Sequence, residues 1–166
     1  MPGIDACLDE IMTLPGARGA AIVDWTSGLA LGTAGESPGG DHETTATETA
    51  ELARAAAEYP AFAPTGVPTP TEPPPAFAPP GGRAPGGPAP GERTPPGHSA
   101  AGDGDAKGPP VEDLIVTNRT GYHVLRFVET TFDSSVFLHL WLDRDTGNLA
   151  LARLRLQQLA ERLVLV

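Results

Sequence analysis

The feature that most limits how this chain can fold is a segment rich in proline and glycine near its middle. Residues 60–110 contain 16 of the 19 prolines and 10 of the 20 glycines. Proline removes a backbone donor and fixes φ, and glycine loses the most conformational freedom on ordering, so neither a helix nor a strand can extend through the segment. Its few apolar residues cannot offset the entropy cost of ordering. We therefore predict a disordered insert over 60–110.

The two parts that flank the insert together have the size of one domain. Residues 1–59 and 111–166 are 59 and 56 residues long, and their sum is a common size for a single folded unit. Neither part alone contains a complete set of elements. We therefore predict one domain built from residues 4–59 and 111–164, interrupted by the insert.

Charge and composition narrow the class of protein. Residues 1–59 carry ten acidic and two basic side chains, in a chain with a net charge of −10. A nucleic-acid-binding protein would show a basic patch instead. An acidic surface favours a partner with a basic surface, or serves only solubility. Arginine outnumbers lysine ten to one, a usage typical of a GC-rich genome.

Membrane insertion and export are not indicated. No apolar run reaches the roughly 18 residues of a membrane span. The first residues show no basic region followed by an apolar core, as a signal peptide would. The single cysteine, Cys7, cannot form an internal disulfide, which fits a reducing compartment. We expect a cytoplasmic protein without a membrane span.

Before the insert, the pattern predicts a helix and then a strand hairpin. Apolar residues recur at helical spacing from Ile4 to Met12, and Cys7 near this stripe is expected to be a small core residue. The continuously apolar run 19–23 is typical of a strand that is buried on both faces. Gly28 fits a turn that requires positive φ, and 29–32 is expected to be the returning strand.

A second helix is predicted from about Thr45 to Tyr59. Thr45 and Glu48 match a capping box, and Pro60 disfavours helical geometry in the residue before it. The inner side of this helix is a stripe of alanines that lets another element approach closely: Ala46, Ala50, Ala53 and Ala57. The outer side carries charged residues that are either simply solvated or contact a partner: Glu48, Glu51, Arg54 and Glu58.

After the insert, three strands and a helix are expected, at 113–117, 122–129, 136–142 and 149–163. Hairpin connections predict an antiparallel arrangement. The fold class is therefore α+β, with a five-stranded antiparallel sheet flanked by three helices in the order helix-strand-strand-helix-strand-strand-strand-helix.

No motif for catalysis or for cofactor binding is present. There is no Gly-Lys-Ser/Thr, so a phosphate-binding loop is absent, and no serine lies in a nucleophile elbow. The histidines do not have zinc-site spacing, and His123 and His139 lie in predicted strands, where pairing with a neighbouring group is expected. We predict that the protein is not an enzyme and that it binds no cofactor or metal.

One family resemblance is visible in the first part of the chain. The segments Leu8–Ile11, Leu14–Asp24 and Gly28–Leu31, together with the order of elements, resemble the Roadblock dynein-light-chain family. More narrowly, they resemble its bacterial branch, found beside Ras-like small GTPases. The most specific part is the Pro-Gly-x-x-Gly-Ala junction that begins at Pro15. The insert departs from the family, which usually has a few residues there.

The resemblance implies a homodimer that binds a small Ras-like GTPase. In the family, the third strands of two copies pair into one ten-stranded sheet, with the second helices side by side. In this chain such an interface would comprise Leu114, Ile115 and Val116 with Ala50, Ala53 and Ala57. Bacterial members bind the GTPase over the paired second helices, where the candidate residues are Glu48, Glu51, Arg54 and Glu58. Some members accelerate GTP hydrolysis by reshaping the GTPase, so no residue is expected to be catalytic.

Three functional readings follow from the sequence. The first is a regulator of a small Ras-like GTPase, as activator or adaptor. The second is a dimeric scaffold that tethers other proteins through the proline-rich insert without contacting a GTPase. The third is a sensor of a small ligand, since sheets with flanking helices also serve that purpose.

Overall fold

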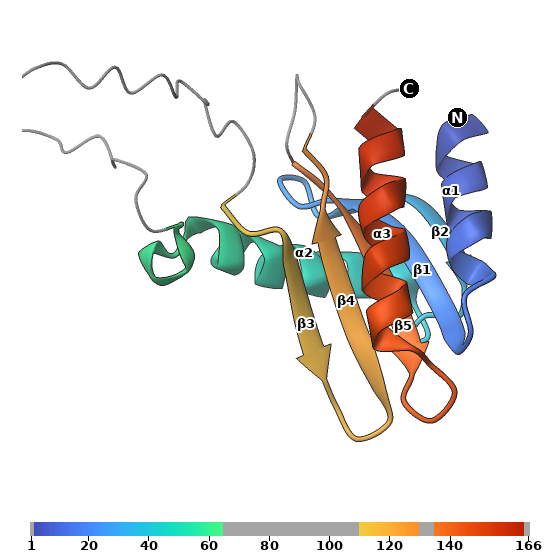
Figure 1. The fold of residues 1–166 in the computed structure, drawn as a ribbon. Coiled ribbons are helices and arrows are strands. Elements are labelled where there is room, and N and C mark those ends of the chain that lie inside the picture. The colour runs from blue at the N-terminus through green and yellow to red at the C-terminus, as the bar shows by residue number, and fades with distance from the viewer. Residues whose placement is uncertain (1, 65–109, 130–134, 165–166) are drawn as a thin grey trace, which may run out of the picture. The chain divides into compact units, whose positions relative to one another are not determined.

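The computed structural model describes residues 2–64, 110–129 and 135–164. Within them the chain forms three α-helices, one short 3-10 helix and five strands (Figure 1). In chain order these are α1 (Pro2–Met12), β1 (Ala17–Asp24), β2 (Leu29–Gly35), α2 (His42–Glu58), η1 (Pro60–Phe62), β3 (Asp113–Thr117), β4 (Gly121–Phe127), β5 (Val136–Asp143) and α3 (Leu149–Val164). The predicted fold class and order of elements are confirmed.

The five strands form one antiparallel sheet in the order β2-β1-β5-β4-β3. β1 and β5 are central, and residues 20–23 of β1 are all buried, as the continuously apolar pattern predicted. The outer strands of the sheet are β2 and β3. β2 runs to Gly35, longer than the predicted return, and Gly28 in the preceding turn has φ +75°.

Each face of the sheet is covered by different helices. In Figure 1, α1 and α3 lie in front of the sheet and α2 crosses behind it. The core under α1 and α3 is the larger one; its fully buried residues include Leu8, Ile11, Ile22, Leu140 and Leu156. The core under α2 joins small residues of the helix to larger residues of the sheet: Ala46, Ala50, Ala53, Val23, Leu125 and Phe137. Cys7 is 6% exposed in the core under α1 and α3, in agreement with the expected small core residue.

α2 begins earlier than the capping pattern predicted. Its N-cap is Asp41, whose Oδ2 accepts a hydrogen bond from the backbone N of Thr44 at 2.9 Å. Thr45, the predicted cap, is buried within the first turns, and its Oγ1 lies 2.7 Å from Oγ of Ser37. Aspartate caps a helix at least as well as threonine, so the match at Thr45 was a coincidence of spacing. The predicted end of α2 before Pro60 is confirmed.

The proline-rich segment is only partly described. Its first residues are ordered, because Pro60–Phe62 form η1 directly after α2. Proline suits the first turn of a helix, where its missing N–H is not needed. Disorder from residue 60 onward is therefore wrong at its start. Residues 65–109 lie outside the described part of the chain, and disorder there stays a prediction, as does the loop predicted over 130–134.

Candidate interaction surfaces

The edge strand β3 presents both side chains and backbone to its surroundings. Leu114 and Ile115 are half-buried, Leu114 toward α2 and Ile115 toward the α1–α3 core. Val116 is 38% exposed. β3 pairs with β4 over all five of its residues without a register shift. The strand is therefore a regular edge with an apolar centre.

Alternation of backbone hydrogen bonds identifies the residues that face away from β4. Phe127 N donates to Glu112 O at 3.0 Å, and Asn118 N donates to Gly121 O at 3.0 Å. In an antiparallel pair, hydrogen-bonded residues alternate along the strand. The N–H and C=O groups between these two points that face outward thus belong to three residues of β3: Asp113, Ile115 and Thr117.

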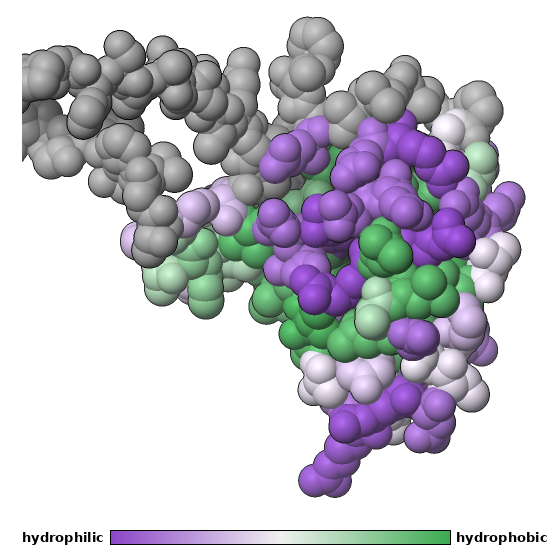
Figure 2. Space-filling model, viewed as in Figure 1, coloured by the Kyte–Doolittle hydropathy of each residue, from purple (hydrophilic) through white to green (hydrophobic). Residues whose placement is uncertain are grey.

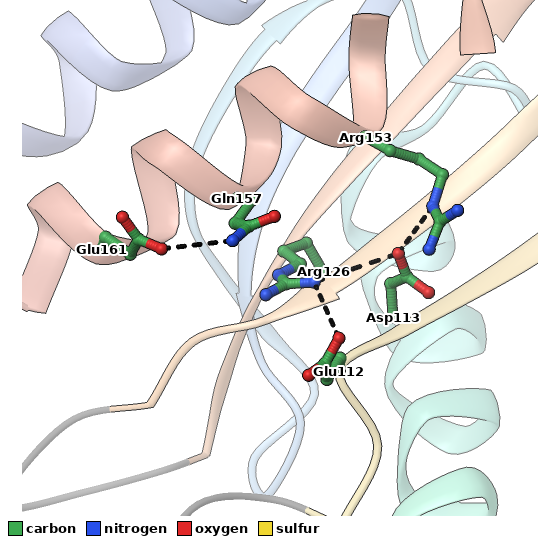
Figure 3. Close-up of polar contacts among 6 residues, drawn as sticks. All are labelled: Glu112, Asp113, Arg126, Arg153, Gln157 and Glu161. Atoms are coloured by element: carbon green, nitrogen blue, oxygen red, sulfur yellow. Dashed lines mark hydrogen bonds and ion pairs between the residues drawn. The ribbon is translucent and has the colours of Figure 1, made fainter. Parts of the chain in front are cut away.

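A polar network holds β3 to β4 and α3 on the α3 side of the sheet (Figure 3). Oδ2 of Asp113 accepts from Nε of Arg153 on α3 at 2.9 Å and lies 3.9 Å from Nη1 of Arg126 on β4. Glu112 lies 3.8 Å from the same Arg126 nitrogen. Nε of Arg126 is buried and has no hydrogen-bond partner among the described residues. The carboxylate of Asp113 is only 15% exposed and contacts both arginines, so it is the centre of the network.

The alanines of α2 face the chain's own sheet. Ala50 is 1% exposed and Ala53 is 0% exposed, and both pack on this sheet; Ala57 is partly buried beside them. Small side chains bring the helix close to Leu125 and Phe137. Ala50 and Ala53, expected at a dimer interface, therefore have no side-chain surface left for a second copy. Any contact with another helix has to use the outer side of α2.

The charged residues of α2 divide into two groups. Glu48, Glu51 and Glu58 are exposed. Arg54 is half-buried instead, and its Nη2 donates to the carbonyl oxygens of Trp25 at 2.9 Å and Thr26 at 3.2 Å. Arg54 thus ties α2 to the β1–β2 turn, and the outer side of the helix is more acidic than the sequence suggested.

Exposed apolar residues accompany these carboxylates, and the sequence analysis did not single them out. Leu52 is 41% exposed, Tyr59 is 59% exposed and Phe62 is 56% exposed. Leu52 and Tyr59 are two helical turns apart and lie away from the alanine stripe. This spacing in the sequence could have predicted that the two side chains lie on the same side of the helix. The outer side of α2 therefore combines negative charge with apolar surface.

Two histidines, His139 buried and His123 half-buried, form a pair on the α2 side of the sheet. His123 Nδ1 lies 3.2 Å from His139 Nε2. Burial lowers the pKa of His139 to about 3, and burial also lowers the pKa of His123. Trp141 stacks on His123 and lies 4.0 Å below the guanidinium of Arg18. The two ring nitrogens are therefore within hydrogen-bond distance of each other.

The cavity between α1 and α3 is small, and the described residues form no cluster of metal ligands. No group of three His, Cys, Asp or Glu residues in this part of the chain could hold a metal ion. A cavity of about 200 Å³ lies between α1 and α3, beside Cys7, Leu159 and the ion pair of Glu10 with Arg162. This is below the roughly 300–1,000 Å³ of most ligand sites. Burial raises the pKa of the Cys7 thiol to about 11, which disfavours the reactive thiolate. None of the described helices is long and apolar enough to cross a membrane.

Comparison with known proteins then bears on the fold. No protein-family model matches the chain, and no curated protein matches it by sequence. A solved Roadblock/LC7 domain from Streptomyces avermitilis matches 96% of this chain and 92% of its own, with a TM-score of 0.53 and 13% identity. The chain has the Roadblock fold. Myxococcus xanthus MglB matches with a TM-score of 0.61, at 16% identity over 98% of this chain and 86% of that chain.

A second MglB structure agrees with this Roadblock assignment. The gliding protein MglB from Thermus thermophilus matches with a TM-score of 0.59 and 16% identity, over 98% of this chain and 87% of that chain. The resemblance carried by the junction at Pro15 is thus confirmed at the level of the fold. At such low identity, individual surface residues are not transferred from these proteins.

Proposed function

We propose that this protein is a homodimeric, non-catalytic regulator of a small Ras-like GTPase. The observation that supports it is the combination, on a Roadblock fold, of a regular strand edge that no other described strand pairs with and an acidic and apolar outer side of α2. The family resemblance implies strand pairing at the first surface and GTPase binding over the second.

The dimer part of the proposal rests on β3. The outward N–H and C=O groups of Asp113, Ile115 and Thr117 form a template for another strand. Within β3 there is no lysine or proline to prevent pairing. In a dimer, the apolar surface of Ile115 and Val116 would be buried away from water, which stabilises the association.

The GTPase part of the proposal rests on the outer side of α2. Glu48, Glu51 and Glu58 attract a basic surface and steer its approach. Leu52 offers an apolar contact between these carboxylates. The chain has no phosphate-binding loop and contributes no nucleophile. Its effect on hydrolysis would therefore come from the conformation in which it holds the GTPase.

Binding to a GTPase provides the test. The chain is mixed with a Ras-like GTPase of the same genome, loaded with GDP or with a non-hydrolysable GTP analogue, and complexes are detected by size-exclusion chromatography. We expect a complex in one nucleotide state that Glu48→Lys with Glu51→Lys weakens roughly tenfold or more. The control, Glu161→Lys on α3, should bind as the unaltered chain does. Equal binding by both variants, or no binding in either state, would contradict the proposal.

The scaffold alternative has a separate readout. If other proteins are tethered through the proline-rich segment, their binding should disappear when residues 65–109 are replaced by a Gly-Ser loop. GTPase binding through α2 should survive that replacement. Turnover of GTP by the purified chain alone would contradict the proposal that it is not an enzyme.

A further inference from the structure

Among the described residues, α2 covers one end of its side of the sheet. α2 packs over the end that contains Val23, Phe127 and Phe137. Toward the other end, three direct cross-strand neighbours on this side are not fully buried: Val116, His123 and Trp141. We call this the open row. Val116 is 38% exposed, and His123 and Trp141 are half-buried.

The C-terminal end of α2 and η1 carry apolar residues that are exposed among the described residues. In Figure 1, the C-terminal part of α2 and η1 extend past the edge strand β3. Figure 2 shows green and pale green residues on this projecting part. Tyr59 and Phe62, 59% and 56% exposed, belong to it. The projecting end therefore has aromatic surface beyond the last strand of its own sheet.

The number of backbone hydrogen bonds that can form favours one register for a pair of β3 strands. A two-fold axis normal to the sheet places one residue opposite its own copy. With Ile115 on the axis, Asp113 lies opposite Thr117, and all three outward-facing residues are used by both copies. A shift of the axis to Leu114 or Val116 leaves one of the three without a partner in the strand. The register centred on Ile115 forms the most hydrogen bonds.

This register reverses the two ends of the sheet in the second copy. The end covered by α2 in one copy then adjoins the open row of the other. The first two strands of the partner lie within about 10 Å of the seam, which a few helical residues at about 1.5 Å each can span. Those two strands are the partner's β3 and β4, which carry the partner's Val116 and the partner's His123.

We infer that Tyr59 and Phe62 at the projecting end of α2 dock on Val116 and His123 of a second copy, in a dimer with Ile115 on its axis. The inference rests on the proposed homodimer and names its contacts. An aromatic ring on a valine and a neutral imidazole removes apolar surface from water on both sides. By symmetry the contact occurs twice, and in each copy it covers the part of the open row that lies on β3 and β4.

Mixed disulfide cross-linking tests the contact directly. In a Cys7→Ala background, a Tyr59→Cys chain is mixed with a Val116→Cys chain, subunits are allowed to exchange, and a mild oxidant is added. We expect a covalent heterodimer on a non-reducing gel from the mixture and much less from either chain alone. His123→Cys replaces Val116→Cys as a second acceptor. The control acceptor is Leu154→Cys, which is 53% exposed on α3 at the opposite face of the sheet.

Light scattering on the same samples separates the two levels of the proposal. A dimeric mass with cross-linking no better than the Leu154→Cys control would overturn the docking and leave the homodimer standing. A monomeric mass for the Cys7→Ala chain, and for the chain without substitutions, would overturn the homodimer itself.

A second measurement uses affinity. Replacing Tyr59 and Phe62 by serine together should raise the dimer dissociation constant roughly tenfold or more, because aromatic anchors carry much of the energy of an interface. Leu154→Ser, equally exposed but on the other face, should leave it unchanged. An unchanged constant in both variants would contradict the docking.

Discussion

The two edge strands of the sheet, β2 and β3, both expose apolar side chains, but they differ in the regularity of their backbone pairing. β2 exposes larger apolar residues, with Leu29 63% exposed and Leu31 49% exposed. Its register with β1 shifts between Ile22 and Val23, which places Leu31 as an extra residue in a bulge. β3 is paired with β4 without a shift. A bulge interrupts the alternation that a neighbouring strand needs, and it is a known protection of sheet edges.

The comparison teaches that exposed apolar residues alone are a poor guide to an edge interface. By hydrophobicity, β2 would be the first choice for strand pairing. By backbone geometry, β3 is the better template, since its outward groups follow one another regularly. Hydrogen bonds along the seam depend on that regularity, whereas a single exposed leucine is common on protein surfaces.

The largest expected effect is loss of the dimer on changing β3. Ile115→Pro removes an outward N–H and leaves the hydrogen bonds to β4 in place, because proline is tolerated on an edge strand. We expect light scattering to report half the mass of the unaltered dimer. Ile115→Lys should act in the same direction by placing a charge at the seam.

The matched change on the other edge is Leu31→Lys, which should leave the dimer intact. A monomeric Leu31→Lys together with a dimeric Ile115→Pro would reverse the comparison and move the interface to β2.

The central strand β5 contains a fully buried histidine, His139, whose titration makes stability depend on pH. Burial holds the pKa of His139 at about 3, below the ordinary 6.5. As the pH falls, the imidazole is therefore protonated in the unfolded chain before it is protonated in the folded one. The free energy of unfolding should therefore decrease from about pH 6.5 downward, by about 2 kcal/mol between pH 7 and pH 5. His123, which faces His139, contributes with the same sign.

Urea unfolding at the two pH values measures this effect in the unaltered chain and in His139→Gln. The variant should lose most of the decrease, whatever its stability at pH 7. An equally steep decrease in the variant would show that other groups are responsible.

A smaller effect should separate the anchoring of the two edges. Asp113→Asn removes a largely buried charge that holds β3 to Arg153 and Arg126, at a cost of about 2 kcal/mol in urea unfolding. At the other edge, Arg18 and Glu36 form an ion pair in which both side chains are well exposed, at 39% and 66%. Glu36→Gln should therefore cost about 0.5 kcal/mol or less. Equal costs would remove the distinction.

A further small effect is expected from shortening the segment that precedes β3. Replacing residues 65–109 with a Gly-Ser loop of about ten residues shortens the closed loop and should stabilise the protomer by about 1 kcal/mol. A cooperative thermal transition at a slightly higher temperature is the expected readout. Loss of that transition would show that the segment takes part in the fold, and that β3 depends on it.

Local sequence patterns were sufficient for the order of elements. Helical spacing from Ile4 to Met12, the apolar run of β1 and the proline after Tyr59 each constrain the backbone through near neighbours. The α+β class followed from the succession of such segments. The capping pattern at Thr45 failed because the helix begins a few residues earlier with Asp41 as N-cap, so the amides that Thr45 would cap already lie inside the helix.

The candidate surfaces were predictable only in part. β3 was expected at an edge, and its pairing with β4 alone among the described strands agrees with that. The alanines of α2 were assigned to a second copy but pack on the protomer's own sheet, and Arg54 was assigned to a partner but binds the β1–β2 turn. A stripe of small residues shows that something approaches closely; it does not say what.

Segments of helix and strand, and where they stop, are thus already encoded in the chain's local pattern, because backbone preferences depend on a few adjacent residues. The network of Asp113 with Arg153, the histidine pair and the open row were decided by the tertiary structure, because they join residues far apart in the sequence. Burial and hydrogen bonding of a side chain depend on which strands become neighbours, and no local pattern records that choice.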